Sequence, residues 1–585
     1  MQRQTWIGIF LITLLMFLWT IWMARSSAPS ASRSTSDTTS LSQGNRDTLP
    51  AEKVDSNFLF ARLGRYAQFA TGKDSLITVE NEVARFQFST KGAALHTHTL
   101  KNLTGLQGKP ITLWDSSQKQ AFIFAEGRAV ISSERLYFTL VHAPPKAIST
   151  EDSVVFRLSL APDTFIQVSY YIPADKYHFR QRIAFHNLKE NLRNPYVSYT
   201  LSYQTPQTEP STASMRPHCA LYYRQAEEVE SITPDEDETQ QKALQGRIRW
   251  ISAKGQFFCA ILQANEAFSS ATLTTLPFSG LPKYQIELQL PLTNDKTEQQ
   301  WYLGPTRYAL LRSYKEDYEK QLNLGWNFIR YINTAFIIPV FGFLEKYISS
   351  YGVIIAILAL LVKILLSPLT WRSYLLGVRM QVVNELPEVK ALEEKYKDQP
   401  DKLMIERSLL YRQLGVSPLS GCVPLLLQIP IFFAMTSFFP NAFELRQQGF
   451  LWTSDLSSYD ALIKWGINIP LIGDHLSLFA LLTALSTLAY TYIVQQGQTT
   501  TPQNLRWLSY ISPVIFFIFL NDYSSALSWY YFVLNLLTIV QTLVMKQFVD
   551  KEALARKLRE IQRKKQNKAQ VAQQRAQMQR WFKRK

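Results

Sequence analysis

The sequence predicts a polytopic α-helical membrane protein with six transmembrane helices and a large all-β periplasmic sandwich domain. Three observations carry this prediction. Very apolar runs lie near both ends of the 585-residue chain, polar and apolar residues alternate through the long stretch between them, and basic residues gather at the C-terminus. A period of two is typical of a half-buried strand, whereas an apolar run of ~20 residues spans a bilayer. With 46% hydrophobic residues, the composition excludes a disordered or collagen-like chain.

Residues 1–25 are expected to form a transmembrane anchor. No charged residue lies between Thr5 and Ala24, and about 20 apolar residues are needed to cross ~30 Å of hydrocarbon. A cleaved signal peptide is the alternative, but its apolar part usually has only ~7–15 residues. Residues 26–56 are dominated by Ser, Thr and Ala, a composition that cannot bury a core, and are expected to be a linker.

Residues 57–305 are expected to form the periplasmic β-sandwich. Runs such as residues 156–160 and 284–290 alternate apolar and polar side chains, and Gly, Pro, Asn and Asp separate them. Residues 306–346 are expected to be a linker followed by an amphipathic helix. The helix is rich in aromatic residues around Arg330 and is interrupted by Pro339, which favours a position in the membrane surface over a span.

Residues 347–546 are expected to form a core of five membrane helices. The five apolar segments are residues 347–369, 423–439, 476–494, 508–520 and 526–545. The first two are separated by residues 370–417, rich in Lys, Arg, Glu, Leu and Gln. This segment predicts a cytoplasmic hairpin of two helices of about 20 residues each, because a plain connector needs only ~2–8 residues.

Residues 547–585 are expected to be a basic cytoplasmic tail. From Lys546 onward the chain has 14 basic and 3 acidic residues, against a net charge of +16 for the whole chain. The positive-inside rule places this tail in the cytoplasm. Six spans then return the N-terminus to the same side and place the β domain in the periplasm of a double-membraned bacterium, with the helices in its inner membrane.

The tail charges suit a contact with ribosomal RNA and would equally bind anionic lipid, the alternative. The residues expected to make this contact are Arg556, Lys557, Arg563, Lys564 and Lys565.

Lys363 is the sharpest feature of the membrane region. It lies in an otherwise uncharged apolar run, where a lysine costs ~2.5–3.5 kcal/mol to insert. Snorkelling toward the headgroups is the alternative, since Leu369 is only about 9 Å further along the helix. Tyr531, Asn535, Thr538 and Thr542 form a polar stripe on the last span. Such residues either line a wet cavity or join neighbouring helices.

Three cysteines, Cys219, Cys259 and Cys422, exclude a disulfide scaffold and a four-cysteine zinc site. Cys219 and Cys259 either pair in the oxidising periplasm or remain thiols. His96 and His98 share a strand face without a third ligand nearby in sequence, so no metal site is expected. No Gly-rich phosphate-binding motif occurs, and no cofactor is expected.

Several motifs resemble the YidC-type membrane protein insertase family, in its long bacterial inner-membrane form with a periplasmic domain. The longest is Pro-Leu-Ser-Gly-Cys-Val-Pro-Leu-Leu-Leu-Gln-Ile-Pro-Ile-Phe, residues 418–432. Further matching segments are residues 361–370, 443–446, 512–516, 525–531 and 535–538.

The resemblance implies an insertase or chaperone, not an enzyme. Its core would enclose a hydrophilic groove open to the cytoplasm and to lipid, along which a client's transmembrane segment enters the bilayer without nucleotide hydrolysis. The implied partners are nascent membrane proteins, the Sec translocon, membrane lipids and the ribosome, the last through the hairpin and tail; DNA is not among them. The residues expected to line the groove are Lys363, Ser367, Gln428, Thr487, Tyr531, Asn535 and Thr538.

The family's intramembrane basic residue is usually arginine, and Lys363 occupies that position in this sequence. The substitution keeps the charge but removes the forked guanidinium. Two other function classes stay open. Lys363 and Ser367 are one helical turn apart and could form the dyad of an intramembrane Ser-Lys hydrolase. A secondary transporter is the other, although the spans show no internal repeat.

Overall fold

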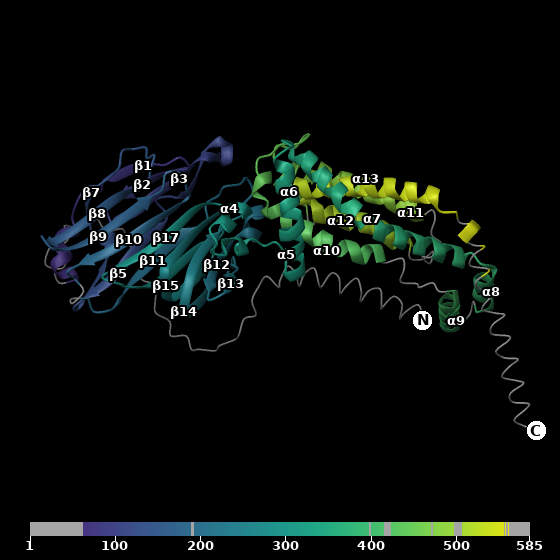
Figure 1. Ribbon diagram of the computed structural model, residues 1–585, viewed down its shortest axis with the longest axis horizontal. Helices are drawn as coiled ribbons and strands as arrows, with labels where there is room; N and C mark the ends of the chain where they lie inside the picture. The colour runs from purple at the N-terminus through teal and green to yellow at the C-terminus, as the bar shows by residue number, and fades with distance from the viewer. Residues whose placement is uncertain are drawn as a thin grey trace, which may run out of the picture. The chain divides into compact units, whose positions relative to one another are not determined.

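The structure, a computed structural model, describes residues 62–188, 192–396, 399–414, 423–469, 472–495, 506–550, 552–554, 556 and 560. The chain divides into two compact units at Leu322 and Asn323. The first is a β domain and the second a helical bundle (Figure 1). The expected anchor at residues 1–25, the linker at 26–56 and most of the tail lie outside the described residues.

The β unit contains a four-stranded and a thirteen-stranded sheet, antiparallel along every strand pairing described within them. The small sheet has the order β1-β2-β3-β4, and the large sheet runs β6-β5-β11-β16-β15-β17-β10-β9-β8-β7, with β14, β12 and β13 attached beside β15. The strands of the small sheet are β1 Leu76–Glu80, β2 Ala84–Ser89, β3 Ala94–Thr104 and β4 Pro110–Trp114. The strands of the large sheet are β5 Lys119–Glu126, β6 Ala129–Ser132, β7 Thr139–His142, β8 Asp152–Ala161, β9 Thr164–Ile172, β10 His178–His186, β11 Tyr196–Gln204, β12 Ala220–Gln225, β13 Glu228–Ile232, β14 Gln240–Lys254, β15 Phe258–Leu276, β16 Lys283–Pro291 and β17 Lys296–Pro305.

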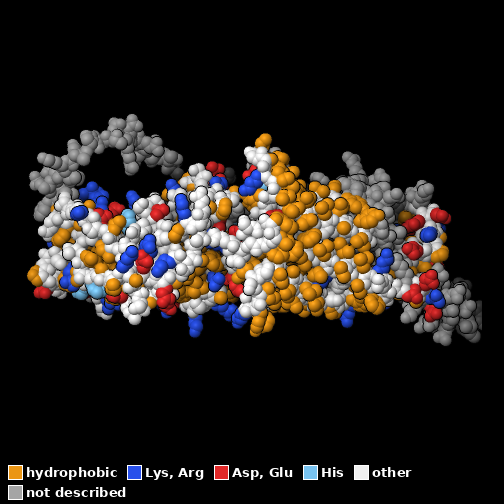
Figure 2. All heavy atoms as spheres, turned by 90° about the horizontal axis from the view of Figure 1, so that it is seen from above, with side chains coloured by type: hydrophobic (Ala, Val, Ile, Leu, Met, Phe, Trp, Pro, Cys, Tyr) orange, Lys and Arg blue, Asp and Glu red, His pale blue; other side chains and the backbone are white. Residues whose placement is uncertain are grey.

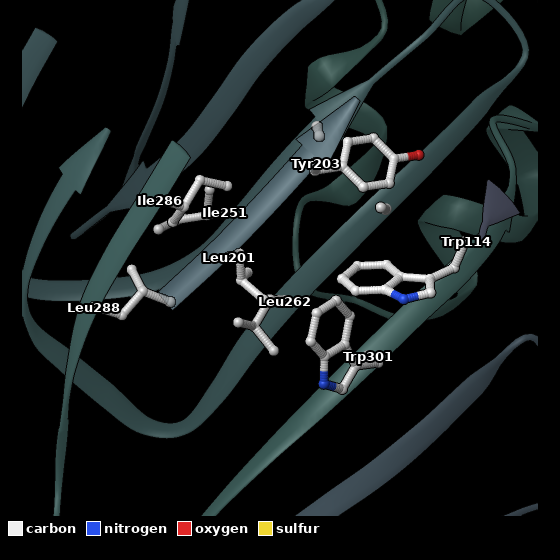
Figure 3. A pocket seen from close by; sticks show the side chains of 10 residues that line it. Trp114, Leu201, Tyr203, Ile251, Leu262, Ile286, Leu288 and Trp301 are labelled. Atoms are coloured by element: carbon white, nitrogen blue, oxygen red, sulfur yellow. The ribbon is translucent and has the colours of Figure 1, made fainter. Parts of the chain in front are cut away.

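Aromatic side chains from both sheets meet in the core, which confirms the predicted sandwich. Trp114 on β4 packs edge-on against Trp301 on β17, with ring centroids 5.5 Å apart, and Phe86 on β2 meets Phe179 on β10 at 5.5 Å. Figure 3 shows the two tryptophans beside Leu201 and Leu262 around a small apolar pocket. This pocket is part of the hydrophobic core, because its described lining consists of apolar and aromatic side chains.

Three of the titratable groups that the sequence singled out in this unit, Cys219, Cys259 and His98, are buried. Cys219 and Cys259 are free thiols, each 1% exposed. His98 is fully buried against the Phe86 ring at 4.9 Å, and burial lowers its pKa to about 3. Among the residues that the structure describes, no group of three or more His, Cys, Asp or Glu is placed to hold a metal.

Helices make up most of the second unit (Figure 1). The short α4, Tyr308–Ser313, precedes it at the end of the β unit. The helices of the second unit are α5 Asn327–Ile332, α6 Ile338–Glu345, α7 Tyr351–Asn384, α8 Pro387–Lys395, α9 Pro400–Leu414, α10 Val423–Phe438, α11 Leu478–Gln495, α12 Arg506–Asn521 and α13 Ser525–Phe548. Between α10 and α11 the chain forms a two-stranded hairpin, β18 Ala461–Ile469 and β19 Gly473–Ser477.

The amphipathic segment is interrupted by one turn of π-helix, Asn333–Ile337, just before Pro339. A proline removes a backbone donor, so a local change of helix type at this point has a direct cause. Asn333 ties the segment to α10, since its Nδ2 donates to the carbonyl oxygen of Ala434 at 3.0 Å. In Figure 1, α5 and α6 run across the direction of α7 and α13, and the position of this segment in the membrane surface stays a prediction.

α7 continues well beyond the predicted span at residues 347–369. It is a single helix of 34 residues that contains Pro368 and ends at Asn384. Leu386, the residue before Pro387, has extended backbone with ψ 141°, because a following proline disfavours helical backbone. The prediction of two hairpin helices of about 20 residues is therefore wrong. The first arm consists of the end of α7 and the 9-residue α8, and the second is the 15-residue α9.

Three helices in the described part of the chain are long and apolar enough to cross a membrane: Asn327–Glu345, α7 and α13. Shorter apolar helices lie at Leu478–Ile493 and Tyr510–Asn521. Apolar side chains cover most of the face of this unit that Figure 2 shows. Large apolar residues such as Ile364 and Val540 are each 58% exposed. The unit thus has the surface of a membrane-embedded bundle, and the count of six spans stays a prediction.

Candidate functional site

Lys363 on α7 faces α13 inside the helical unit. Its Nζ donates a hydrogen bond to Thr538 Oγ1 at 2.8 Å, and both residues are half-buried. Thr538 Oγ1 in turn donates to the carbonyl oxygen of Leu534 at 2.6 Å, within its own helix. No Asp or Glu of the described ranges forms an ion pair with Lys363, so its charge is held by a hydroxyl alone.

One turn further along α7, Ser367 and Thr370 also face α13. Gln541 bridges them, because its Nε2 donates to Thr370 Oγ1 at 3.0 Å and to Ser367 Oγ at 3.3 Å. The sequence interpretation omitted Gln541, although it follows Thr538 by three residues on the same helix face. Together the five residues Lys363, Ser367, Thr370, Thr538 and Gln541 form a polar seam between α7 and α13. Because Ser367 bonds Gln541 and Lys363 bonds Thr538, the geometry does not support a Ser-Lys dyad.

Asn535 and Thr487 join a different pair of helices. Asn535 Nδ2 on α13 donates to Thr487 Oγ1 at 2.8 Å and to Ser486 Oγ at 3.0 Å, both on α11. Thr483, fully buried one turn before Thr487, donates to the backbone oxygen of Ser528 on α13 at 2.8 Å. These contacts are the interhelical hydrogen bonds that polar residues make in membrane bundles.

Tyr531 and Gln428 differ in their surroundings. Tyr531 is 4% exposed, donates to the carbonyl oxygen of Phe432 at 3.3 Å, and packs against the Phe516 ring at 5.3 Å. Gln428 on α10 is exposed and makes no hydrogen bond to the other six predicted residues. The structure therefore joins Lys363 to Thr538 and Thr487 to Asn535, and it leaves Gln428 apart from both pairs.

The polar seam gives the apolar bundle one cation and several hydroxyl and amide groups within reach of each other. Such a surface can bind a carboxylate or keep a polar segment hydrated inside a low-dielectric region. The five seam residues are one lysine, three hydroxyl residues and one glutamine, and their mutual hydrogen bonds include no activated nucleophile. The site is thus a polar surface with one positive charge between two largely apolar helices.

Of the five tail residues predicted to contact the ribosome or anionic lipid, the structure describes only Arg556. Arg556 is exposed and pairs with Glu552 four residues earlier, at 3.5 Å. Lys557, Arg563, Lys564 and Lys565 lie outside the described residues. In the hairpin, Arg407 on α9 pairs with Glu393 on α8 at 3.0 Å, which fastens the two short helices together.

Comparison with known proteins finds two family models that together cover most of the chain. Residues 343–552 match the 60Kd inner membrane protein family, and residues 76–336 match the YidC periplasmic domain. The membrane protein insertase YidC of Amoebophilus asiaticus is 31% identical over 97% of this chain and 96% of its own length. The membrane protein insertase YidC of Parabacteroides distasonis is 32% identical over 89% of this chain and 85% of its own.

A solved structure also aligns with the chain. The crystal structure of an active YidC insertase with its first transmembrane domain resolved covers 83% of this chain and 95% of its own, with 18% identity and a TM-score of 0.32.

Proposed function

Because this chain belongs to the YidC family of membrane protein insertases, we propose that its polar seam between α7 and α13 receives the client's transmembrane segment and polar tail. Members of the family are bacterial inner-membrane proteins with a periplasmic domain, and the chain functions as a membrane protein insertase. Newly made membrane proteins are therefore its substrates.

The observation that carries the proposal is the hydrogen bond between Lys363 Nζ and Thr538 Oγ1. A lysine ammonium has three N–H donors, and a hydroxyl acceptor leaves its positive charge uncompensated. In a half-buried position this charge attracts acidic residues of a passing client more strongly than it would in water. The same attraction lowers the desolvation penalty that opposes moving an acidic tail across lipid.

In this proposal the remaining predicted residues either line the groove or hold its shape. Ser367, with Thr370 and Gln541, extends the polar surface along α7, and exposed Gln428 presents an amide on α10. Tyr531 bounds the groove with its ring against α10 and α12. Thr487 and Asn535 hold α11 against α13, so that the groove keeps its shape.

The test is insertion of matched clients by the reconstituted full-length protein. Lys363→Ala weakens insertion of a client with an acidic tail and spares the same client with a neutral tail, whereas Lys363→Arg preserves both. Lys346→Ala is the control, because Lys346 is an exposed lysine at the end of α6, away from the seam. Equal insertion of the acidic client by Lys363→Ala and the unaltered protein would refute the role of the charge.

We further propose that both termini are cytoplasmic and that the tail and the hairpin contact the ribosome. The 14 basic residues from Lys546 onward support the contact of the tail, because the phosphates of ribosomal RNA bind clustered Lys and Arg. The Sec translocon is a further proposed partner, on the basis of the family resemblance. Deletion of residues 556–585 should weaken co-sedimentation with ribosomes. Retained co-sedimentation together with lost binding to anionic vesicles would assign the tail to lipid instead.

A further inference from the structure

We propose that the β18–β19 hairpin, residues 461–477, is a membrane-surface anchor that lies among the lipid headgroups at the α5–α6 end of the bundle. The hairpin contains no residue of the polar seam, and it overlaps the expected span at residues 476–494 only in its last two residues. Its four most exposed apolar side chains occupy one strand, and two more lie in the loop that leads to it. They are Leu462 at 53%, Ile463 at 51%, Ile467 at 72% and Ile469 at 40% exposed, with Leu451 at 64% and Trp452 at 43%.

Buried polar residues hold this apolar strand outward. Asp460, 4% exposed, accepts hydrogen bonds from Trp452 Nε1 at 2.8 Å and from the Phe479 amide at 3.0 Å. Asn521, fully buried at the end of α12, donates to the carbonyl oxygens of Ile472 and His475 and accepts from the Ser477 amide. The base of the hairpin is thereby fixed to α11 and α12, so its exposed apolar side chains are a built feature of the surface.

The position of the hairpin points to lipid as the occupant of this surface. β19 ends at Ser477 and α11 begins at the next residue, and α11 exposes Leu485 and Tyr492 at 53% and 56%. Both side chains belong to the helical unit, whose face in Figure 2 is largely apolar. The apolar hairpin therefore extends a lipid-facing surface, and burial of apolar area in lipid is favourable on the same grounds as elsewhere in the bundle.

The unpaired backbone groups of the hairpin favour the headgroup region over the hydrocarbon core of the membrane. β18 and β19 pair with each other and with no other described strand, so each has an outer edge of backbone N–H and C=O groups. Hydrocarbon cannot hydrogen-bond such an edge, whereas the headgroup region can. Trp465 and Lys464 suit that region, since tryptophan favours the interface and an exposed lysine can reach lipid phosphate. The Trp465 Nε1 is already satisfied by the carbonyl oxygen of Gly473 at 3.1 Å.

The test measures the depth of a fluorescent label in the full-length protein. Ile467→Cys is labelled with bimane, after the three native cysteines are replaced by alanine, and reconstituted at one copy per lipid nanodisc. Val130→Cys is the matched control, because Val130 is an apolar strand residue, 62% exposed, in the β unit. Lipids brominated close to the headgroup are expected to quench the label at 467 strongly, lipids brominated at the chain ends weakly, and the label at 130 not at all.

Two results would overturn the proposal. If the label at 467 in single-copy nanodiscs is quenched no more than the unquenched label at 130, the hairpin stays in water. Protection of the label only in nanodiscs that contain two copies would assign the apolar strand to a second copy of the chain. If Ile467→Cys does not fold, Leu462→Cys on the same strand gives the same measurement, because it is 53% exposed and outside the hydrogen bonds of Asp460 and Asn521.

Discussion

Lys363 on α7 and Thr538 on α13 are joined by a hydrogen bond of 2.8 Å, although 175 positions separate them in the chain. The bond uses one N–H of the ammonium and leaves the others available for water or a client carboxylate. Thr538 thus positions the charge toward the seam without neutralising it. The consequences of this arrangement, and of three other contacts, can be measured.

Thr538→Val removes the acceptor but keeps the lysine. We expect insertion of an acidic-tailed client to fall about threefold, since interhelical hydrogen bonds in membranes average ~0.6 kcal/mol. The loss should be smaller than that of Lys363→Ala, because the charge remains. Thr542→Val is the control, because the Thr542 hydroxyl bonds only the carbonyl oxygen of Thr538 within α13. A Thr538→Val protein with unchanged insertion would show that the hydroxyl does not position the lysine.

Asn535 and Thr487 should be coupled energetically across α13 and α11. A double-mutant cycle with Asn535→Leu and Thr487→Val is expected to give a coupling of about 0.6 kcal/mol, the average for such pairs in membranes. The measurement is reversible unfolding of the helical unit in mixed detergent micelles. Strictly additive effects would contradict the bond between Asn535 Nδ2 and Thr487 Oγ1.

Gly352 at the start of α7 has no room for a side chain. A Cβ at this position would lie 2.2 Å from ring atoms of Phe450, and the Gly352 carbonyl oxygen accepts a hydrogen bond from Trp529 Nε1 at 2.8 Å. We expect Gly352→Ala to lower the free energy of unfolding by about 1–3 kcal/mol, the usual cost of overpacking.

The matched control for Gly352→Ala is Gly377→Ala on the same helix. A Cβ at Gly377 meets nothing within 4 Å, so alanine should stabilise α7 there by roughly 0.5–1 kcal/mol. Thermal unfolding in detergent measures both variants. Similar shifts of the two would show that Phe450 does not limit the space at Gly352.

His98 should make the β unit less stable in acid. Burial lowers its pKa to about 3, against an ordinary value near 6.5, so only the unfolded chain takes up a proton between these values. Stability is therefore complete above pH ~6.5 and declines as the pH falls toward 3, by up to ~1.4 kcal/mol per pH unit. His98→Leu should flatten the pH dependence of thermal unfolding between pH 7 and 5. His186→Leu, at an exposed position of β10, should leave that dependence unchanged; an equal slope for His98→Leu and the unaltered protein would contradict the prediction.

Local sequence properties determined much of this protein. The β domain followed from alternation at a period of two, and the segments predicted at residues 423–439 and 526–545 correspond to α10 and α13 within a few residues. Lys363 stood out because one charge in an apolar run is visible without any structure. These features depend on neighbouring residues, whose spacing reports the period and polarity of a single element.

Tertiary structure decided what depends on contacts between distant residues. The length of α7, the role of Gln541 as the bridge from α13 to Ser367 and Thr370, and the β18–β19 hairpin were all missed. Each is set by which surfaces pack together. The residues next to a polar side chain in the sequence do not tell whether it faces lipid or a neighbouring helix. The sequence could therefore single out Lys363 as a candidate residue, while only the packing of α7 against α13 placed Thr538 beside it.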